Sequence, residues 1–146
     1  MTTVARDLLR GAVDLHIHAA PDLLPRVMDD LELARTAAEA GMAALVLKSH
    51  HMLTADRAQI AQKLHPQIKV FGGLALNLPA CGGLNPEAVK VAIRMGAREI
   101  WLPTLSSAHH SASIKTTVTG NLGLMSAGFS QTPVAVVTED GTVPPE

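Results

Sequence analysis

Apolar segments alternate along the chain with segments in which apolar residues recur every three or four positions. The first kind is typical of buried strands, and the second of helices with one buried face. Successive strand-like segments start roughly 25–30 residues apart, which is the length of one βα unit. They are Ala12–His18, Ala43–His50, Ile68–Leu76 and Arg98–Thr104. The pattern predicts an α/β fold with parallel strands, about four βα units long.

Three helices are predicted in the gaps between these strands, and each has a residue suited to begin it. They run from about Asp30 to Ala40, from Thr54 to about Leu64, and from Asn85-Pro86-Glu87 to Gly96. Asp29 or Asp30, Thr54 and Asn85 have side chains that can cap the free amides of a first turn. Gly41 stands where a left-handed residue often ends a helix. The residues that begin and end the helices and the hydrophobic periodicity thus both predict the order βαβαβαβ.

The pattern weakens after Thr104. Residues Leu105–Gly120 are rich in Ser, Thr and Ala, which predicts a long loop or an irregular helix at the end of the fourth strand. No repeat beyond the βα rhythm is visible. With 146 residues the chain has the length of one ordinary domain. We therefore expect residues 1–146 to form a single domain.

Composition narrows the class of protein. Hydrophobic residues make up 47% of the chain but aromatic residues only 2%, so the core is expected to consist mainly of Ala, Leu, Val, Ile and Met. A net charge of −1 and a pI of about 6.6 provide no basic surface for nucleic acid. The single cysteine, Cys81, fits a reducing compartment. Without a signal peptide or a run of about 18 apolar residues, we expect a cytoplasmic protein that binds neither nucleic acid nor membranes.

The sequence Asp14-Leu15-His16-Ile17-His18 carries the strongest chemical signal. Side chains alternate along a strand, so Asp14, His16 and His18 are expected on one face. Two imidazoles at the carboxyl end of a strand can reach a single metal ion, and parallel α/β folds place their sites at that end. A local hydrogen bond is the alternative role for either histidine. Asp14, which lies deeper, is expected to orient a histidine rather than to bind metal.

The second strand ends in Lys48-Ser49-His50-His51. Lys48 and His50 share one parity, and on the inner face of a barrel both would point toward the histidines of the first strand. His50 is then a candidate third metal ligand, and His51 could take its place. Lys48 could hold an anionic group of a substrate, could be carbamylated and bridge two metals, or could lie on the surface. Lys48 and His50 are therefore the candidate catalytic residues.

Loops after the strands supply the candidate substrate-binding residues. Arg26 could bind a carboxylate or a phosphate through its forked guanidinium. Asn77 could donate to a substrate carbonyl, and Thr104 and His109 follow the fourth strand. Each of these polar residues could equally be solvated. Trp101 could line the pocket or pack under a helix, because parity alone does not decide its side.

The Asp14–His18 segment resembles the opening motif of the amidohydrolase superfamily and of the related polymerase-and-histidinol-phosphatase (PHP) hydrolases. Over nearly the whole chain, the segments DLHIHAAPDLLPR, VLKSHH, GGLNPEAV and WLPT resemble an amidohydrolase-like family of bacteria and archaea. The resemblance implies a (β/α) barrel of the TIM type with a mono- or dinuclear metal site. It makes His16 and His18 metal ligands, and it places His50 where PHP proteins often have a second-strand histidine.

The resemblance covers only the N-terminal half of such a barrel. The superfamily normally takes further ligands, a late histidine and a late aspartate, from the second half, and no segment here matches them. We therefore expect residues 1–146 to form a partial, TIM-like (β/α) barrel, a truncated product or a natural half-barrel, that pairs with another copy of itself or with a missing second half. The expected cofactor is a divalent metal ion, zinc or alternatively manganese or iron.

Together these features predict a metal-dependent hydrolase that uses metal-activated water. Its small-molecule substrate would be an amide, a lactone or a phosphate ester. No carboxylate in the sequence is placed as an obvious general base. The alternative is a catalytically inactive half-barrel fragment or interaction domain, which the lack of a second half favours.

Overall fold

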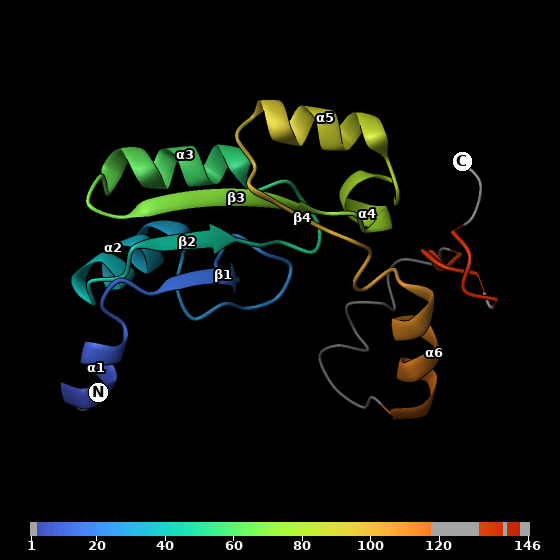
Figure 1. The fold of residues 1–146 in the computed structure, drawn as a ribbon, viewed down its shortest axis with the longest axis horizontal. Helices are drawn as coiled ribbons and strands as arrows, with labels where there is room; N and C mark the ends of the chain where they lie inside the picture. Colours follow the sequence, from blue (N-terminus) through green and yellow to red (C-terminus); the bar gives the residue numbers. More distant parts are fainter. Residues whose placement is uncertain (1–2, 118–131, 139, 144–146) are drawn as a thin grey trace.

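Helices and strands alternate along the chain in a computed structural model that describes residues 3–117, 132–138 and 140–143 (Figure 1). The strands are β1 (Val13–Ile17), β2 (Ala44–Leu47), β3 (Lys69–Ala75) and β4 (Glu99–Trp101). The helices are α1 (Thr3–Leu8), α2 (Asp30–Glu39), α3 (Ala55–Leu64), α4 (Leu78–Cys81), α5 (Pro86–Arg94) and α6 (Ala108–Thr117). Every strand and helix predicted from the hydrophobic pattern is present.

All the strands run parallel in the order β1-β2-β3-β4, so each strand pairs with its neighbours in the sequence. The sheet is curled into half a barrel, with α3 and α5 along one side and α6 beyond the strand ends (Figure 1). The expected α/β fold, a partial (β/α) barrel, is thus confirmed. Because the strands point the same way, their carboxyl ends share one edge, where barrels of this kind carry their sites.

Local signals explain where α2 and α5 begin. The Asp29 carboxylate accepts hydrogen bonds from the backbone amides of Leu31 and Glu32, at 2.9 and 2.8 Å. The Glu32 carboxylate in turn accepts from the Asp29 amide at 3.1 Å, which completes a capping box. Asn85 similarly accepts from the amide of Ala88 at 3.1 Å. Of the two aspartates considered for the first cap, the earlier one is therefore the cap.

Thr54 precedes α3 but does not cap it. Its hydroxyl donates to the carbonyl of Leu47 at 2.6 Å and accepts from the amide of Gly73 at 2.9 Å. The residue is fully buried, so the hydroxyl ties the end of β2 to β3 beneath the helix. The capping role predicted for Thr54 is wrong, because strand groups distant in sequence take up its hydroxyl.

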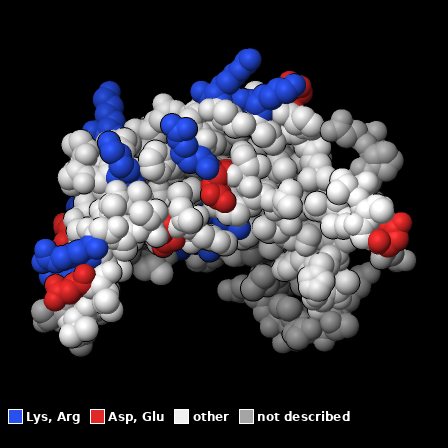
Figure 2. All heavy atoms as spheres, viewed as in Figure 1, with Lys and Arg blue, Asp and Glu red and all other residues white. Residues whose placement is uncertain are grey.

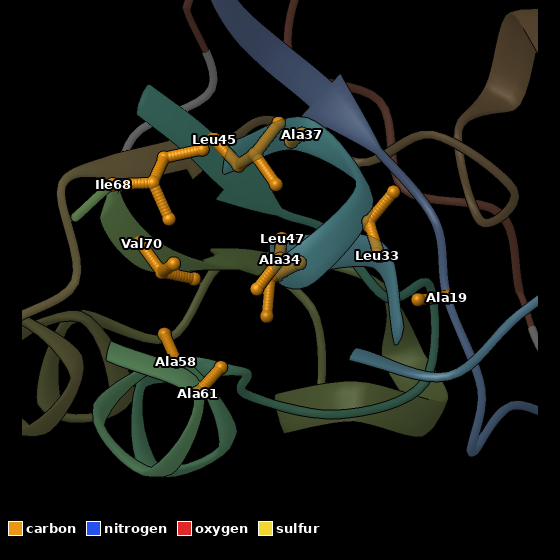
Figure 3. Close-up of a cluster of buried hydrophobic side chains, with 10 residues drawn as sticks. All are labelled: Ala19, Leu33, Ala34, Ala37, Leu45, Leu47, Ala58, Ala61, Ile68 and Val70. Carbon is orange, nitrogen blue, oxygen red and sulfur yellow. The ribbon is translucent and has the colours of Figure 1, made fainter. Parts of the chain in front are cut away.

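Small apolar side chains fill the space between the sheet and the helices (Figure 3). One cluster joins β2 and β3 to α2 and α3; its members are Ala19, Leu33, Ala34, Ala37, Leu45, Leu47, Ala58, Ala61, Ile68 and Val70. A second cluster, Ala55, Leu74, Leu76, Ala92 and Ala97, lies between β3 and α5. The alanines allow the helices to lie close to the sheet. Neither cluster contains an aromatic residue among the described residues, as the composition predicts.

A buried ion pair fastens the loop after β1 to the helices. The Arg57 guanidinium on α3 binds both carboxylate oxygens of Asp30 on α2, at 2.6 and 2.9 Å. It also donates to the carbonyls of Ala19 and Pro21, at 3.1 and 2.9 Å. The side chains of Arg57 and Asp30 are only 13% and 9% exposed. The pair therefore fixes the start of the loop that follows His18.

The structure adds α1 and α4, two short helices that the hydrophobic pattern does not predict. α6 lies within Leu105–Gly120, where a helix was one of the two expectations. Residues 118–120 of that segment lie outside the described residues. No helix in the described ranges has the length and apolar character needed to cross a bilayer. On the face drawn in Figure 2, Lys and Arg side chains are scattered, some beside acidic ones, and form no continuous basic surface.

Candidate metal centre

The end of β1 carries His16 and His18, and its geometry is irregular. The pairing of β1 with β2 shifts between Asp14 and Ile17. Such a bulge breaks the strict alternation on which the sequence-based expectation rests. The Asp14 carboxylate accepts a hydrogen bond from the backbone amide of His16 at 2.9 Å. Asp14 therefore supports the backbone of the irregular strand, instead of the imidazole ring that it was expected to orient.

The rings of His16 and His18 meet at this strand end. Their Nε2 atoms lie 3.3 Å apart, and their ring centroids lie 5.3 Å apart. The Nζ atom of Lys48, which follows β2, lies 3.3 Å from Nε2 of His16. Lys48 is only 3% exposed, whereas His16 is exposed. The first two strands thus bring their predicted functional residues together.

His50 and His51 extend the cluster beyond β2. The His50 ring lies 4.7 Å from the His18 ring, tilted by 30°. Its Nδ1 atom lies 3.0 Å from the hydroxyl of Thr104. The His51 side chain is 6% exposed, and its Nδ1 lies 3.4 Å from Oδ1 of Asp22. Both histidines considered as a third ligand therefore belong to the cluster, with His50 against His18 and His51 against Asp22.

Asp22 and Arg26, in the loop after β1, form a charged pair beside His18. The Asp22 side chain is 1% exposed, and its Oδ2 accepts from Nε and Nη2 of Arg26 at 2.9 and 2.7 Å. Nη2 of Arg26 also lies 3.2 Å from Nδ1 of His18. A guanidinium only donates, so this Nδ1 accepts and the neutral ring carries its proton on Nε2. Metal ligation through Nε2 would require the other tautomer, with the proton on Nδ1, where Oδ2 of Asp22 lies 3.9 Å away, too far for a hydrogen bond.

Asn77 is fully buried at the end of β3, and its amide is used within the protein. Its Oδ1 accepts from the backbone amides of Thr104 and Ser106, at 2.9 and 3.1 Å. Its Nδ2 donates to the carbonyl of His50 at 3.1 Å and to the hydroxyl of Thr104 at 2.9 Å. Asn77 therefore positions His50 and Thr104, and both hydrogens of its Nδ2 are engaged within the protein; its role as a donor to substrate stays a prediction.

Trp101 lines the cluster from β4. Its ring lies 6.0 Å from the His16 ring, and Nζ of Lys48 lies 5.0 Å from its centroid. Glycine at position 73 makes this possible, because a Cβ there would overlap the indole and lie 2.7 Å from the carbonyl oxygen of Glu99. Side-chain alternation alone does not decide on which side of the sheet Trp101 lies. In the structure it lies on the same side as Lys48.

Burial and neighbouring cations keep the imidazoles neutral. Burial, together with the charges of Arg26 and Lys48, lowers the pKa of His18 to about 4. Burial, together with His18 and Lys48, lowers the pKa of His50 to about 3. Burial and Lys48 also lower the pKa of His16. At neutral pH the rings of His18 and His50 are therefore uncharged, the state in which an imidazole can bind a metal.

Not every predicted residue reaches the cluster, and some members were not predicted. His109 is exposed on α6, and within the described residues no contact joins it to the other histidines. The sequence assigns no role to Asp22 and leaves the side of Trp101 open. Both are placed by contacts between distant segments, so no local pattern marks them. Gly73 is the nearest signal for Trp101, but it is informative only once the sheet register is known.

The His16–His18 pair fits a divalent metal ion. In a tetrahedral site with Zn–N bonds of about 2.0–2.1 Å, two ligand nitrogens lie about 3.3–3.4 Å apart. The two Nε2 atoms here are 3.3 Å apart, which with the proton on His18 is also the length of a hydrogen bond between the rings. Within the described part of the chain, no group of three or more His, Cys, Asp or Glu side chains is arranged to hold one ion. The two nitrogens are therefore spaced like two ligands of one ion, and the described residues add no third ligand to them.

Fold and site together define a class: partial parallel (β/α) barrels with a histidine cluster at the carboxyl ends of the strands. Residues 11–146 match a family model described as "Family of unknown function (DUF6282)". The match spans nearly the whole chain, so the chain belongs to this family. No curated protein and no solved structure matched it.

Proposed function

We propose that the chain is the histidine-bearing part of a metal-dependent hydrolase of the amidohydrolase type. One observation carries the proposal: Nε2 of His16 and Nε2 of His18 are 3.3 Å apart, the separation of two nitrogens on one tetrahedral cation. The pair lies where (β/α) barrels carry their catalytic groups. The Asp14–His18 motif, which resembles the opening motif of amidohydrolases, supports the same assignment.

Each residue of the cluster would have a distinct task. A divalent cation bound there would lower the pKa of a water molecule and polarise the bond to be hydrolysed. His16 and His18 would hold the ion, with the proton of His18 on Nδ1, the ring nitrogen that faces Arg26 and Asp22. His50 is the candidate third ligand, because its Nδ1 faces the hydroxyl of Thr104 and leaves Nε2 to bind. The substrate would be an amide, a lactone or a phosphate ester.

A second candidate function is a half-barrel without catalysis, which acts as an interaction domain. The finding that favours it is that the described residues group no third ligand with His16 and His18. The edge strand β1 also exposes Val13 and Leu15, by 53% and 59%. An apolar strand edge of this kind is suited to pairing with another copy or with the second half of a barrel.

Metal uptake tests the proposal directly. The double variant His16→Ala/His18→Ala should lose bound zinc, measured by elemental analysis after zinc loading and gel filtration. His65→Ala, which removes an imidazole at the end of α3, should keep the wild-type zinc content. Unchanged zinc in the double variant would show that the site is misassigned. Tightly bound zinc together with hydrolysis of amide, lactone or phosphate esters favours the enzyme, whereas an inert protein favours the interaction domain.

A further inference from the structure

The cluster contains two basic side chains, Arg26 and Lys48, and among the described residues only Arg26 has an anionic partner. Both Nε and Nη2 of Arg26 donate to Oδ2 of Asp22, whose side chain is almost completely buried. This pairing neutralises Arg26 and holds its guanidinium in place. Arg26 was the sequence-based candidate for binding a carboxylate or phosphate, but its fork is already occupied by a carboxylate of the protein.

Lys48 is the cation without such a partner. It is 3% exposed, and among the described residues no carboxylate lies within ion-pair distance of its Nζ. Its contacts are Nε2 of His16 at 3.3 Å and the face of Trp101 at 5.0 Å. An ammonium group has three N–H donors, and this imidazole nitrogen engages at most one of them. Burying a charge without a counterion is costly, so the position favours an incoming anion.

The surroundings of Lys48 point the same way. Its Nζ lies 3.3 Å from Nε2 of His16, and its positive charge contributes to the lowered pKa of His16, His18 and His50. The carboxylate beside His18, Asp22, already serves Arg26, and that of Asp14 accepts a hydrogen bond from the backbone amide of His16. A divalent cation on His16 and His18 would add further positive charge. A ligand that brings negative charge would therefore be bound far better than a neutral one of the same shape.

We propose that Lys48, and not Arg26, binds an anionic oxygen group of the substrate, a carboxylate or a phosphate, over the indole of Trp101. The proposal deepens the hydrolase assignment and rests on it, because it names the class of substrate as anionic small molecules. The indole forms one wall of the subsite, and glycine at position 73 leaves the space that this ring needs.

The chain provides its own reporter for this subsite. Trp101 is the only tryptophan in the sequence, and there is no tyrosine. Its fluorescence can be followed while the full chain, in EDTA, is titrated with sodium malonate or sodium phosphate at constant ionic strength. Malonamide, the neutral counterpart of malonate, is the control ligand. Saturable changes with malonate alone indicate a carboxylate substrate, with phosphate alone a phosphate ester, and with both a general anionic oxygen site.

Variants decide whether Lys48 is responsible. Lys48→Met should weaken anion binding at least about tenfold, the loss expected for a charge-assisted hydrogen bond. Lys48→Arg should retain it, and Lys69→Met, an exposed lysine at the start of β3, should leave it unchanged. The proposal is overturned if wild type shows no saturable change, if Lys48→Met binds as well as wild type, or if Arg26→Met alone abolishes binding. Because EDTA removes metal, these outcomes are independent of the zinc-uptake test.

Discussion

The helix-covered side of the sheet and the carboxyl ends of its strands both contain buried cations, but they use them differently. On the helix side, Arg57 binds Asp30 through two hydrogen bonds and donates to two backbone carbonyls as well. At the strand ends, Lys48 contacts an imidazole and an indole, and no carboxylate within the described residues pairs with it. The first arrangement uses its polar groups to hold the fold together. The second keeps donors and lone pairs available for a ligand.

The largest expected effect comes from breaking the paired region. Arg57→Met leaves the Asp30 carboxylate buried without its partner, which should lower the free energy of unfolding by about 3–5 kcal/mol. Lys48→Met, by contrast, removes a buried charge that has no counterion, and should leave this free energy unchanged or raise it. Urea denaturation of both variants measures the difference. Comparable losses in the two variants would show that the regions do not differ as argued.

An exposed ion pair provides the control for that comparison. Arg35 and Glu39 lie one turn apart on α2, with side chains 56% and 58% exposed. Arg35→Met should therefore cost no more than about 0.5 kcal/mol, because solvent screens such pairs. A cost similar to that of Arg57→Met would mean that loss of the arginine side chain, and not loss of the buried pair, destabilises the protein.

A smaller effect is expected at Asn77, which lies at the strand ends beside His50 and Thr104. Asn77→Ala leaves the partly buried amides of Thr104 and Ser106 without their acceptor, and should cost about 1–3 kcal/mol. Because Asn77 also holds the His50 backbone and the Thr104 hydroxyl, the variant should shift the ring resonances of His50 in histidine-selective NMR. Asn85→Ala, which removes a helix cap outside the cluster, should cost about 1 kcal/mol and leave those resonances in place. Unchanged His50 resonances in Asn77→Ala would contradict the positioning role.

The order of strands and helices could be predicted from the sequence because its signals are local. Apolar periodicity marks each element, and the caps at Asp29 and Asn85 bind amides within the next three residues. Thr54 shows where local reasoning ends. Its side chain is suited to capping, but the carbonyl of Leu47, on the neighbouring strand, binds its hydroxyl. Competition between near and distant partners cannot be resolved without the fold.

The candidate site, like the fold, could be predicted where its signals are local in the sequence. His16 and His18 are two residues apart at the end of β1, so the alternation of side chains along a strand predicts that they meet. The bulge near Asp14 could not be predicted in this way. The approach of Lys48 follows from parity once the strands are known to be parallel neighbours. The positions of Asp22 and Trp101 depend on loop conformation and sheet register, and these are set by contacts between segments far apart in the chain.

The smallest expected effect is on pH dependence, and it separates the strand ends from the helix side. Burial is the largest cause that lowers the pKa of His18 to about 4 and that of His50 to about 3. Both rings titrate near pH 6.5 when the chain is unfolded. Below that pH the unfolded chain binds more protons than the folded one, so the free energy of unfolding falls as the pH falls toward 4 and 3. Above pH 6.5 both states are neutral at these rings and the contribution is complete.

The measurement is urea denaturation in EDTA at pH 7 and pH 6, an interval in which carboxylates do not titrate appreciably. The expected loss is about 1 kcal/mol at most, because the rings are partly exposed and only part of their titration lies in this interval. His18→Gln/His50→Gln should flatten the dependence, since it removes both groups. Arg57→Met should retain the full dependence despite its much lower stability, because it leaves both histidines in place. If the histidine variant keeps the wild-type slope, the pH sensitivity arises elsewhere, and the two regions are not separable by their protonation chemistry.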